Sequence, residues 1–153
     1  MATPATQPKG GQFVLHAKAL HGNPFDGHTL AGAIDDTEKN TGIEVRGAHV
    51  DKGYRGHDYP NKVRVWITGQ VRRTTASLKR EMKRRAAIEP VIGYVKADHR
   101  MDGNYLKGRD GDRINAVLAA AGFNFHLLIR WFAELLCALI QAILGQTKML
   151  QIA

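Results

Sequence analysis

Two acidic residues, Asp51 and Glu89, occupy positions where a carboxylate could bind a metal ion. Asp51 ends an apolar run and is followed by a glycine-rich turn at residues 52–57. Glu89 lies four residues after Arg85 and seven residues before Lys96. At ~100° per residue in a helix, these three side chains share one face within ~40°. An acid between two cations on one face suits a carboxylate that holds a metal ion beside a polyanion.

Oxygen ligands of this kind favour Mg²⁺ or Mn²⁺, which usually take two or three carboxylates together with substrate phosphate. A pair of such ions can clamp the attacking and leaving oxygens of an in-line phosphoryl displacement. A plainer interpretation also fits the residues. An Asp at the end of a strand is commonly a turn former, and Glu89 could pair only with Arg85.

Other catalytic chemistries find little support in the sequence. The seven histidines show neither the His-x-x-x-His nor the cysteine-paired spacing of a zinc site. Ser77 is the only serine and lacks the Gly-x-Ser-x-Gly context of a hydrolase nucleophile. The single cysteine, Cys137, lies in an apolar helical stretch and is expected to be an inert core thiol. Trp66 and Trp131 are likewise expected in the core.

The basic charge is concentrated in one part of the chain. Residues 52–113 hold 16 of the 22 Lys and Arg and 7 of the 14 Asp and Glu, a local charge of +9 within a total of +8. A confined basic excess beside two candidate metal carboxylates predicts nucleic acid as the partner. A solvated helix face and an acidic membrane surface are the alternatives. Residues 1–10 contain no apolar signal core, so we expect a disordered lead and a cytoplasmic protein.

A chain of 153 residues corresponds to one domain, and its patterns predict alternating strands and helices. The expected elements are strands at 13–20, 43–50 and 63–69, helices at 29–40 and 74–98, and a long apolar helix at 112–144. Pro90 is expected to bend the second helix or to lie in the first turn of a new one. This order is α/β in character.

The last helix is apolar enough to raise the question of a membrane. Arg130 and Glu134 lie one helical turn apart in the middle of the run, which argues against a span and favours an i,i+4 pair. Because its apolar surface is broad, we expect the helix to pack on the sheet or on a partner.

Five stretches, in order along the chain, resemble bacterial insertion-sequence transposases with a DDE catalytic domain. They are GNPFDGHTL at 22–30, HVDKGYRGH at 49–57, RRAAIEPVIG at 84–93, NYLKG at 104–108 and DRINA at 112–116. The resemblance covers about residues 11–140. It implies an RNase H-like fold that cuts and rejoins DNA by two-metal phosphoryl transfer.

The resemblance assigns roles to particular residues. Asp51 matches the second catalytic Asp and Glu89 the catalytic Glu, both as ligands of Mg²⁺ or Mn²⁺. Arg85 and Lys96 fill the Arg and Lys positions of the signature around the Glu, whereas Met82 stands where the family carries Tyr. We expect DNA contacts from Tyr54 and phosphate contacts from the cations. These cations are Lys52, Arg55, Arg72, Arg73, Lys79, Arg80, Lys83, Arg84, Arg85 and Lys96.

The chain resembles only the C-terminal part of such a catalytic domain. The first two strands and the first catalytic Asp have no counterpart, so we expect a truncated RNase H-like α/β fold with long C-terminal helices. The expected domain is residues 11–145, with a tail at 146–153. Without the first strand, 13–20 and 43–50 should lack ladder partners, which predicts a rearranged or marginal fold that dimerises through open edges.

Two readings of function follow from this resemblance. The first is a transposase catalytic fragment acting on transposon ends, which is either inactive alone because it lacks the first Asp or active when an upstream half completes it. The second is a non-catalytic DNA-binding fragment that interferes with intact transposase through mixed assembly. Neither reading has a membrane as the partner. A third, weaker reading is a membrane protein or a partner-helix protein built on residues 114–144.

Overall fold

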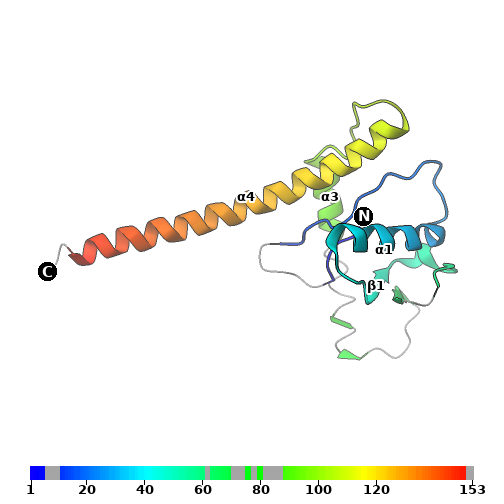
Figure 1. Cartoon of the computed structure of the whole chain (residues 1–153), viewed down its shortest axis with the longest axis horizontal. Coiled ribbons are helices and arrows are strands. Elements are labelled where there is room, and N and C mark those ends of the chain that lie inside the picture. Colours follow the sequence, from blue (N-terminus) through cyan, green and yellow to red (C-terminus); the bar gives the residue numbers. More distant parts are fainter. Residues whose placement is uncertain (6–10, 61–62, 70–74, 77–78, 81–87, 151–153) are drawn as a thin grey trace.

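The computed structural model describes residues 1–5, 11–60, 63–69, 75–76, 79–80 and 88–150. Its elements in chain order are α1 (Asp26–Thr41), β1 (Gly47–Val50), the 3₁₀ turn η1 (Lys52–Tyr54), β2 (Arg64–Ile67), α3 (Ile88–Ala97) and α4 (Gly108–Leu150). Figure 1 shows a small body built from α1, the strands and α3, from which α4 projects far to one side. The described residues are therefore mixed α/β.

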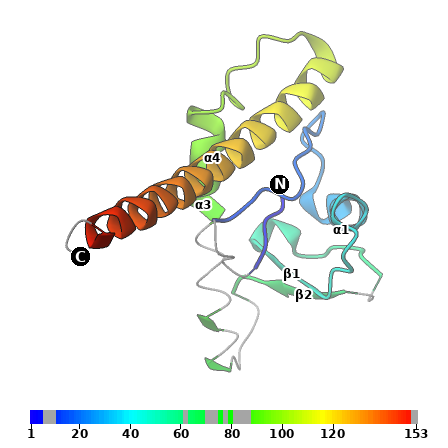
Figure 2. The same ribbon diagram turned by 60° about the vertical axis from the view of Figure 1, so that its left-hand side comes forward.

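The sheet of the described residues consists of β1 and β2, which pair in parallel with Gly47 opposite Arg64 and Val50 opposite Ile67. The helix α1 lies over this sheet (Figure 2). The residues buried between them form one apolar cluster, Leu30, Ile34, Val50, Tyr59, Val63 and Ile67. Because strands of a parallel pair point the same way, the ends of β1 and β2 meet at the same edge.

The spacing of its buried residues explains why α1 lies on the sheet. Leu30, Ile34 and Thr37 recur at intervals of four and three residues and are all buried, which is the period of one helix face. The helix stops at Gly42, whose left-handed backbone (φ 68°) lets its N–H donate to Glu38 O at 2.8 Å. The expected helix at 29–40 is thus confirmed, with a start three residues earlier.

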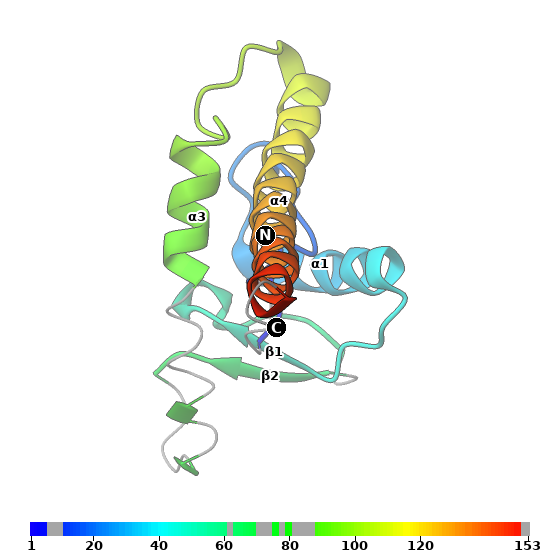
Figure 3. The same cartoon turned by 90° about the vertical axis from the view of Figure 1, so that its left-hand side faces the viewer.

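A second apolar cluster joins α3 to the first half of α4. It consists of Val91 and Val95 from α3, Ala119, Ala120 and Phe123 from α4, and Val14 from the N-terminal region. Val95 is fully buried. The two helices run side by side in Figure 3. Small alanines on α4 permit this close approach, so α4 is attached to the body through its first half.

The strand expected at 13–20 does not form. The backbone of Val14 is bonded instead to the side chain of Asn124, which accepts from Val14 N–H at 2.8 Å and donates to Val14 O at 2.8 Å. His16 makes an isolated antiparallel bridge with Ala2, whose N–H donates to His16 O at 2.8 Å. The expectation of a disordered lead over 1–10 is therefore wrong for residues 1–5, and residues 6–10 lie outside the described residues.

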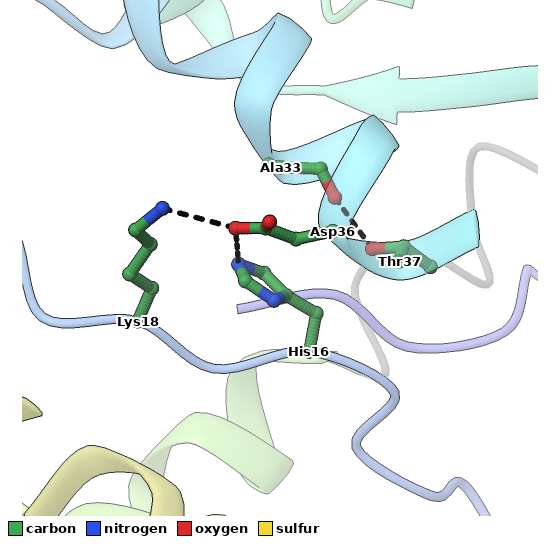
Figure 4. A network of polar contacts seen from close by, with 5 residues as sticks. All are labelled: His16, Lys18, Ala33, Asp36 and Thr37. Carbon is green, nitrogen blue, oxygen red and sulfur yellow. Dashed lines mark hydrogen bonds and ion pairs between the residues drawn. The ribbon is translucent and has the colours of Figure 1, made fainter. Parts of the chain in front are cut away.

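Polar contacts hold the same segment against α1 (Figure 4). Lys18 Nζ donates to Asp36 Oδ2 at 3.0 Å, and His16 Nε2 lies 4.0 Å from the same oxygen. Thr37 Oγ1 donates back to Ala33 O at 2.6 Å within the helix. Side chains thus replace a strand ladder in fixing residues 14–18.

The strand expected at 43–50 is shorter than predicted, and only Gly47–Val50 is in the sheet. The prediction that 43–50 would lack a ladder partner is wrong, because β1 pairs directly with β2. The strand expected at 63–69 is confirmed as Arg64–Ile67. Of the helix expected at 74–98, the structure gives α3, with Pro90 in its first turn, where a missing N–H costs little.

The long helix begins at Gly108 rather than at 112 and continues to Leu150, so the expected tail at 146–153 is helical as far as Leu150. The expectation that this helix packs on the sheet is wrong. Beyond Leu128, its side chains are exposed as far as they are described. The core placements expected for Cys137 and Trp131 are wrong, since both are exposed. By length and composition Gly108–Leu144 could cross a membrane, which is weak evidence taken alone.

Candidate functional site

Asp51 directly follows the last residue of β1, at the C-terminal edge of the parallel sheet. Its backbone is extended, and its Oδ1 accepts from Gly53 N–H at 2.9 Å, which caps η1. The residue is exposed. The turn-forming role considered from the sequence is therefore real. It occupies Oδ1 with one backbone donor and leaves a solvent-accessible carboxylate at the sheet edge.

A second carboxylate, that of Asp26, lies beside Asp51. The two carboxylates approach the same point beside Gly53, because a Cβ placed there would collide with Asp26 Oδ2 and lie 3.1 Å from Asp51 Oδ1. Asp26 is the first residue of α1 and is exposed. The spacing of the two acids in the sequence does not indicate this approach, because 25 residues separate them and the packing of α1 against η1 brings them together.

Two cations of η1 and its cap reach over the end of β2. A Cβ on Gly69 would lie 3.5 Å from Lys52 Cε and 3.8 Å from Arg55 Nη2. Both side chains are exposed. Thr68 is held here as well, because its N–H and its hydroxyl each lie 3.1 Å from Val50 O. The edge of the sheet therefore carries two carboxylates and two cations within one short stretch of surface.

Tyr54 is placed differently from its neighbours. It is half-buried and packs against the apolar cluster beneath α1. Its ring anchors η1 to the body, so Lys52 and Arg55 on either side of it are turned to the surface. The structure thus gives Tyr54 a positioning role at this edge.

Glu89 lies in the first turn of α3 and is exposed, and Lys96 lies in the last turn and is exposed. Each charge suits its end of the helix dipole, which stabilises an acid near the N-terminus and a base near the C-terminus. This arrangement by itself explains both residue types. Arg85, the third member of the expected helical face, lies outside the described residues, as do Arg72, Arg73, Lys83 and Arg84.

The described residues hold no group of three or more His, Cys, Asp or Glu side chains able to bind a metal ion. Asp51 and Asp26 form a pair of carboxylates, and no third ligand among the described residues completes a metal site with them. A cavity of about 310 Å³ lies between residues 1–5, α1 and β1, and its lining includes Ile88 but neither Asp51 nor Glu89. The candidate site is therefore an open surface at the sheet edge that carries both acidic and basic side chains.

Comparison with known proteins adds no further constraint. No family model, no curated protein and no solved structure matches the chain.

Proposed function

We propose that this chain is the C-terminal part of a DDE-type transposase catalytic domain and that it binds DNA at the C-terminal edge of its sheet. The observation that supports this proposal is the position of Asp51. It directly follows β1 of the parallel sheet and lies inside the motif HVDKGYRGH. In open α/β sheets, ligands bind outside the carboxyl ends of the strands. The RNase H-like fold implied by the sequence resemblance is part of the same proposal.

The charges at this edge support a phosphate-bearing ligand. Lys52 and Arg55 lie together over Gly69 and are free to meet a backbone phosphate from solvent. Cations that contact phosphates supply most of the affinity of sequence-independent DNA binding. Within this proposal, the further phosphate contacts expected from the sequence come from Arg72, Arg73, Arg84, Arg85 and Lys96, of which Lys96 is described and exposed.

The carboxylates support Mg²⁺ or Mn²⁺ as the cofactor. Asp51 and Asp26 present carboxylate oxygens at the same point beside Gly53, and these hard ions prefer oxygen ligands. Their chemistry, when bound, would be to stabilise charge on a transferring phosphate. In this proposal Asp51 and Glu89 are the catalytic ligands named by the resemblance, and Asp26 holds the ion near Asp51.

A chain with this ligand set is expected to be inactive by itself in strand transfer. The described residues place two carboxylates at the sheet edge, Asp26 and Asp51, and form no group of three that includes Glu89. Two carboxylates hold two metal ions poorly. The second candidate function follows from the same observation. It is a DNA-binding fragment without chemistry, which would enter mixed assemblies with intact transposase.

The test measures binding of the full chain to a fluorescent DNA duplex by anisotropy over a series of salt concentrations. The double variant Lys52→Gln, Arg55→Gln should bind more weakly and reduce the slope of log K against log salt by about 1.8. The charge-matched control Lys39→Gln, Lys107→Gln, with exposed lysines elsewhere, should change affinity less than twofold. Equal losses in both double variants would contradict a site at the sheet edge.

The catalytic part of the proposal needs a separate assay. Supercoiled and short linear DNA are incubated with the wild-type chain and Mg²⁺, and nicked and joined products are counted. Negligible joining is expected, with normal DNA binding. Robust Mg²⁺-dependent joining that disappears in Glu89→Gln would show a complete active site and overturn the fragment proposal. Nicking without joining that depends on Asp51 would favour the enzyme reading over the purely DNA-binding one.

A further inference from the structure

The outward surface of α4 carries an uninterrupted apolar repeat. Positions spaced alternately by four and three residues are apolar over four heptads, and we call them the outer stripe. They are Ile114, Leu118, Ala121, Phe125, Leu128, Phe132, Leu135, Leu139 and Ala142. This is the a/d repeat of a helix that packs along another helix. Phe125 and Phe132 are 62% and 59% exposed, so the described part of this chain doesn't cover the repeat.

The outer stripe faces away from the body. The residues of α4 that contact the body include Ala116, Ala119, Ala120, Phe123, Asn124 and Leu127. At 100° per residue, their centre lies about 130° around the helix from the centre of the outer stripe. Figure 1 shows the second half of α4 extending clear of the other elements. A second helix can therefore lie along the whole stripe without meeting the body.

The polar residues of the projecting half lie on the opposite side from the stripe. His126, Arg130, Glu134 and Gln141 recur at intervals of four, four and seven residues, which continues the line of the body-facing residues. Within the described part of the chain, Arg130 and Glu134 form no ion pair with each other. Both charges are thus left in water when the outer stripe is covered, as on the outside of a coiled coil.

We propose that the outer stripe binds the same stripe of a second copy of this chain, forming a helical dimer interface. Ile129, Leu136 and Ile143, all exposed, flank the stripe and widen it. Nine large apolar side chains of the stripe and its flanks, each about half exposed, offer roughly 700 Å² at about 80 Å² apiece. That is the area each partner contributes to a stable interface, and it exceeds the few hundred Å² that monomers usually leave exposed.

A second copy fits these observations better than a lipid bilayer. The repeat starts at Ile114, in the half of α4 that is fastened to the body, where lipid could not surround the helix. A bilayer span needs apolar surface on every side, whereas Arg130 and Glu134 lie in the middle of the projecting half. A two-fold pairing also covers the stripe of both copies at once, because the same surface is used twice. The proposal stands independently of the proposed function.

The test is the mass of the full chain in solution, measured by light scattering after size exclusion and by sedimentation at several concentrations. A defined dimer of twice 16.9 kDa is expected for the wild type. Phe132→Glu should raise the dissociation constant of the dimer by about 100-fold or more, because it places a charge in the outer stripe. Gln141→Glu puts the same charge on the polar side of the same helix and should leave the dimer intact.

Several outcomes would overturn the proposal. A wild-type monomer at tens of micromolar would do so, as would a dimer that Phe132→Glu and Gln141→Glu weaken equally. Circular dichroism of both variants checks that α4 still forms. Leu118→Glu tests a second position in the outer stripe. Association with neutral phosphatidylcholine vesicles by a chain that never dimerises without them would assign the stripe to lipid instead.

Discussion

Asn124 on α4 takes the place of a neighbouring strand for Val14, 110 residues earlier in the chain. Its amide oxygen accepts from Val14 N–H and its amide nitrogen donates to Val14 O, each at 2.8 Å. One side chain thus satisfies both polar groups of a backbone unit whose own side chain is buried. The contact fastens the N-terminal segment to the helix that projects from the body.

Replacing Asn124 by alanine should lower the free energy of unfolding by about 2 kcal/mol, because it leaves two partly buried backbone groups without partners. The measurement is urea unfolding followed by circular dichroism. Gln141→Ala, on the exposed part of the same helix, is the matched control and should change the free energy by less than about 0.5 kcal/mol. A similar small change for Asn124→Ala would mean that water satisfies Val14 equally well.

The two glycines Gly47 and Gly93 should respond in opposite directions to alanine. A Cβ on Gly47 would collide with the ring of Trp66, which is stacked on His49 with centroids 4.6 Å apart, so Gly47→Ala should cost about 1–3 kcal/mol of stability. A Cβ on Gly93 meets no atom within 4 Å and lies in α3. Gly93→Ala should therefore stabilise by about 0.5–1 kcal/mol. Thermal unfolding of both variants tests the pair, and a destabilised Gly93→Ala would contradict the open surface there.

Stability should fall as the pH drops below the usual pKa of histidine, partly because of His16. Burial lowers the pKa of His16 from its ordinary 6.5, the positive N-terminus of Met1 lowers it further, the carboxylate of Asp36 opposes the shift, and Lys18 adds a smaller lowering. The unfolded chain then binds a proton at a higher pH than the folded chain. The contribution is fully present above pH 6.5 and is lost as the pH falls through the lowered folded pKa.

The check on this pH dependence compares unfolding free energies at about pH 7.5 and about pH 5.5. His16→Gln should reduce the loss between the two values, whereas His21→Gln, at an exposed position, should leave it unchanged. An unchanged loss in His16→Gln would show that other groups carry the dependence.

Metal binding at the sheet edge should depend on both Asp26 and Asp51, whose carboxylates approach Gly53. Under the proposed function, Asp51→Asn and Asp26→Asn should each weaken Mn²⁺ binding by about tenfold or more, since each removes a charged oxygen ligand. Titration followed by electron paramagnetic resonance measures free Mn²⁺ directly. Glu44→Gln, an exposed acid before β1, is the control. If Asp26→Asn leaves affinity unchanged while Asp51→Asn lowers it, the ion would be held without Asp26.

The sequence by itself determined the elements that rest on local periodicity. The apolar stripe of Leu30, Ala33 and Ile34 placed α1, and the apolar run before Asp51 placed that carboxylate at the end of a strand. Hydrophobic period and turn residues act over a few positions, so neighbouring residues suffice to read them. The exposed state of Asp51 follows from the same turn.

Only the tertiary structure decided the contacts between distant segments. Residues 13–20 alternate as a strand would, yet Asn124 and Ala2 take the hydrogen bonds that a ladder would have used. Packing of α1 on η1 brings Asp26 to Asp51, which no spacing in the sequence indicates. The apolar character of α4 was clear from its residues, but which face stays bare depends on where the body attaches. Such contacts depend on long-range packing, and packing overrides local preference wherever it satisfies more backbone and apolar surface.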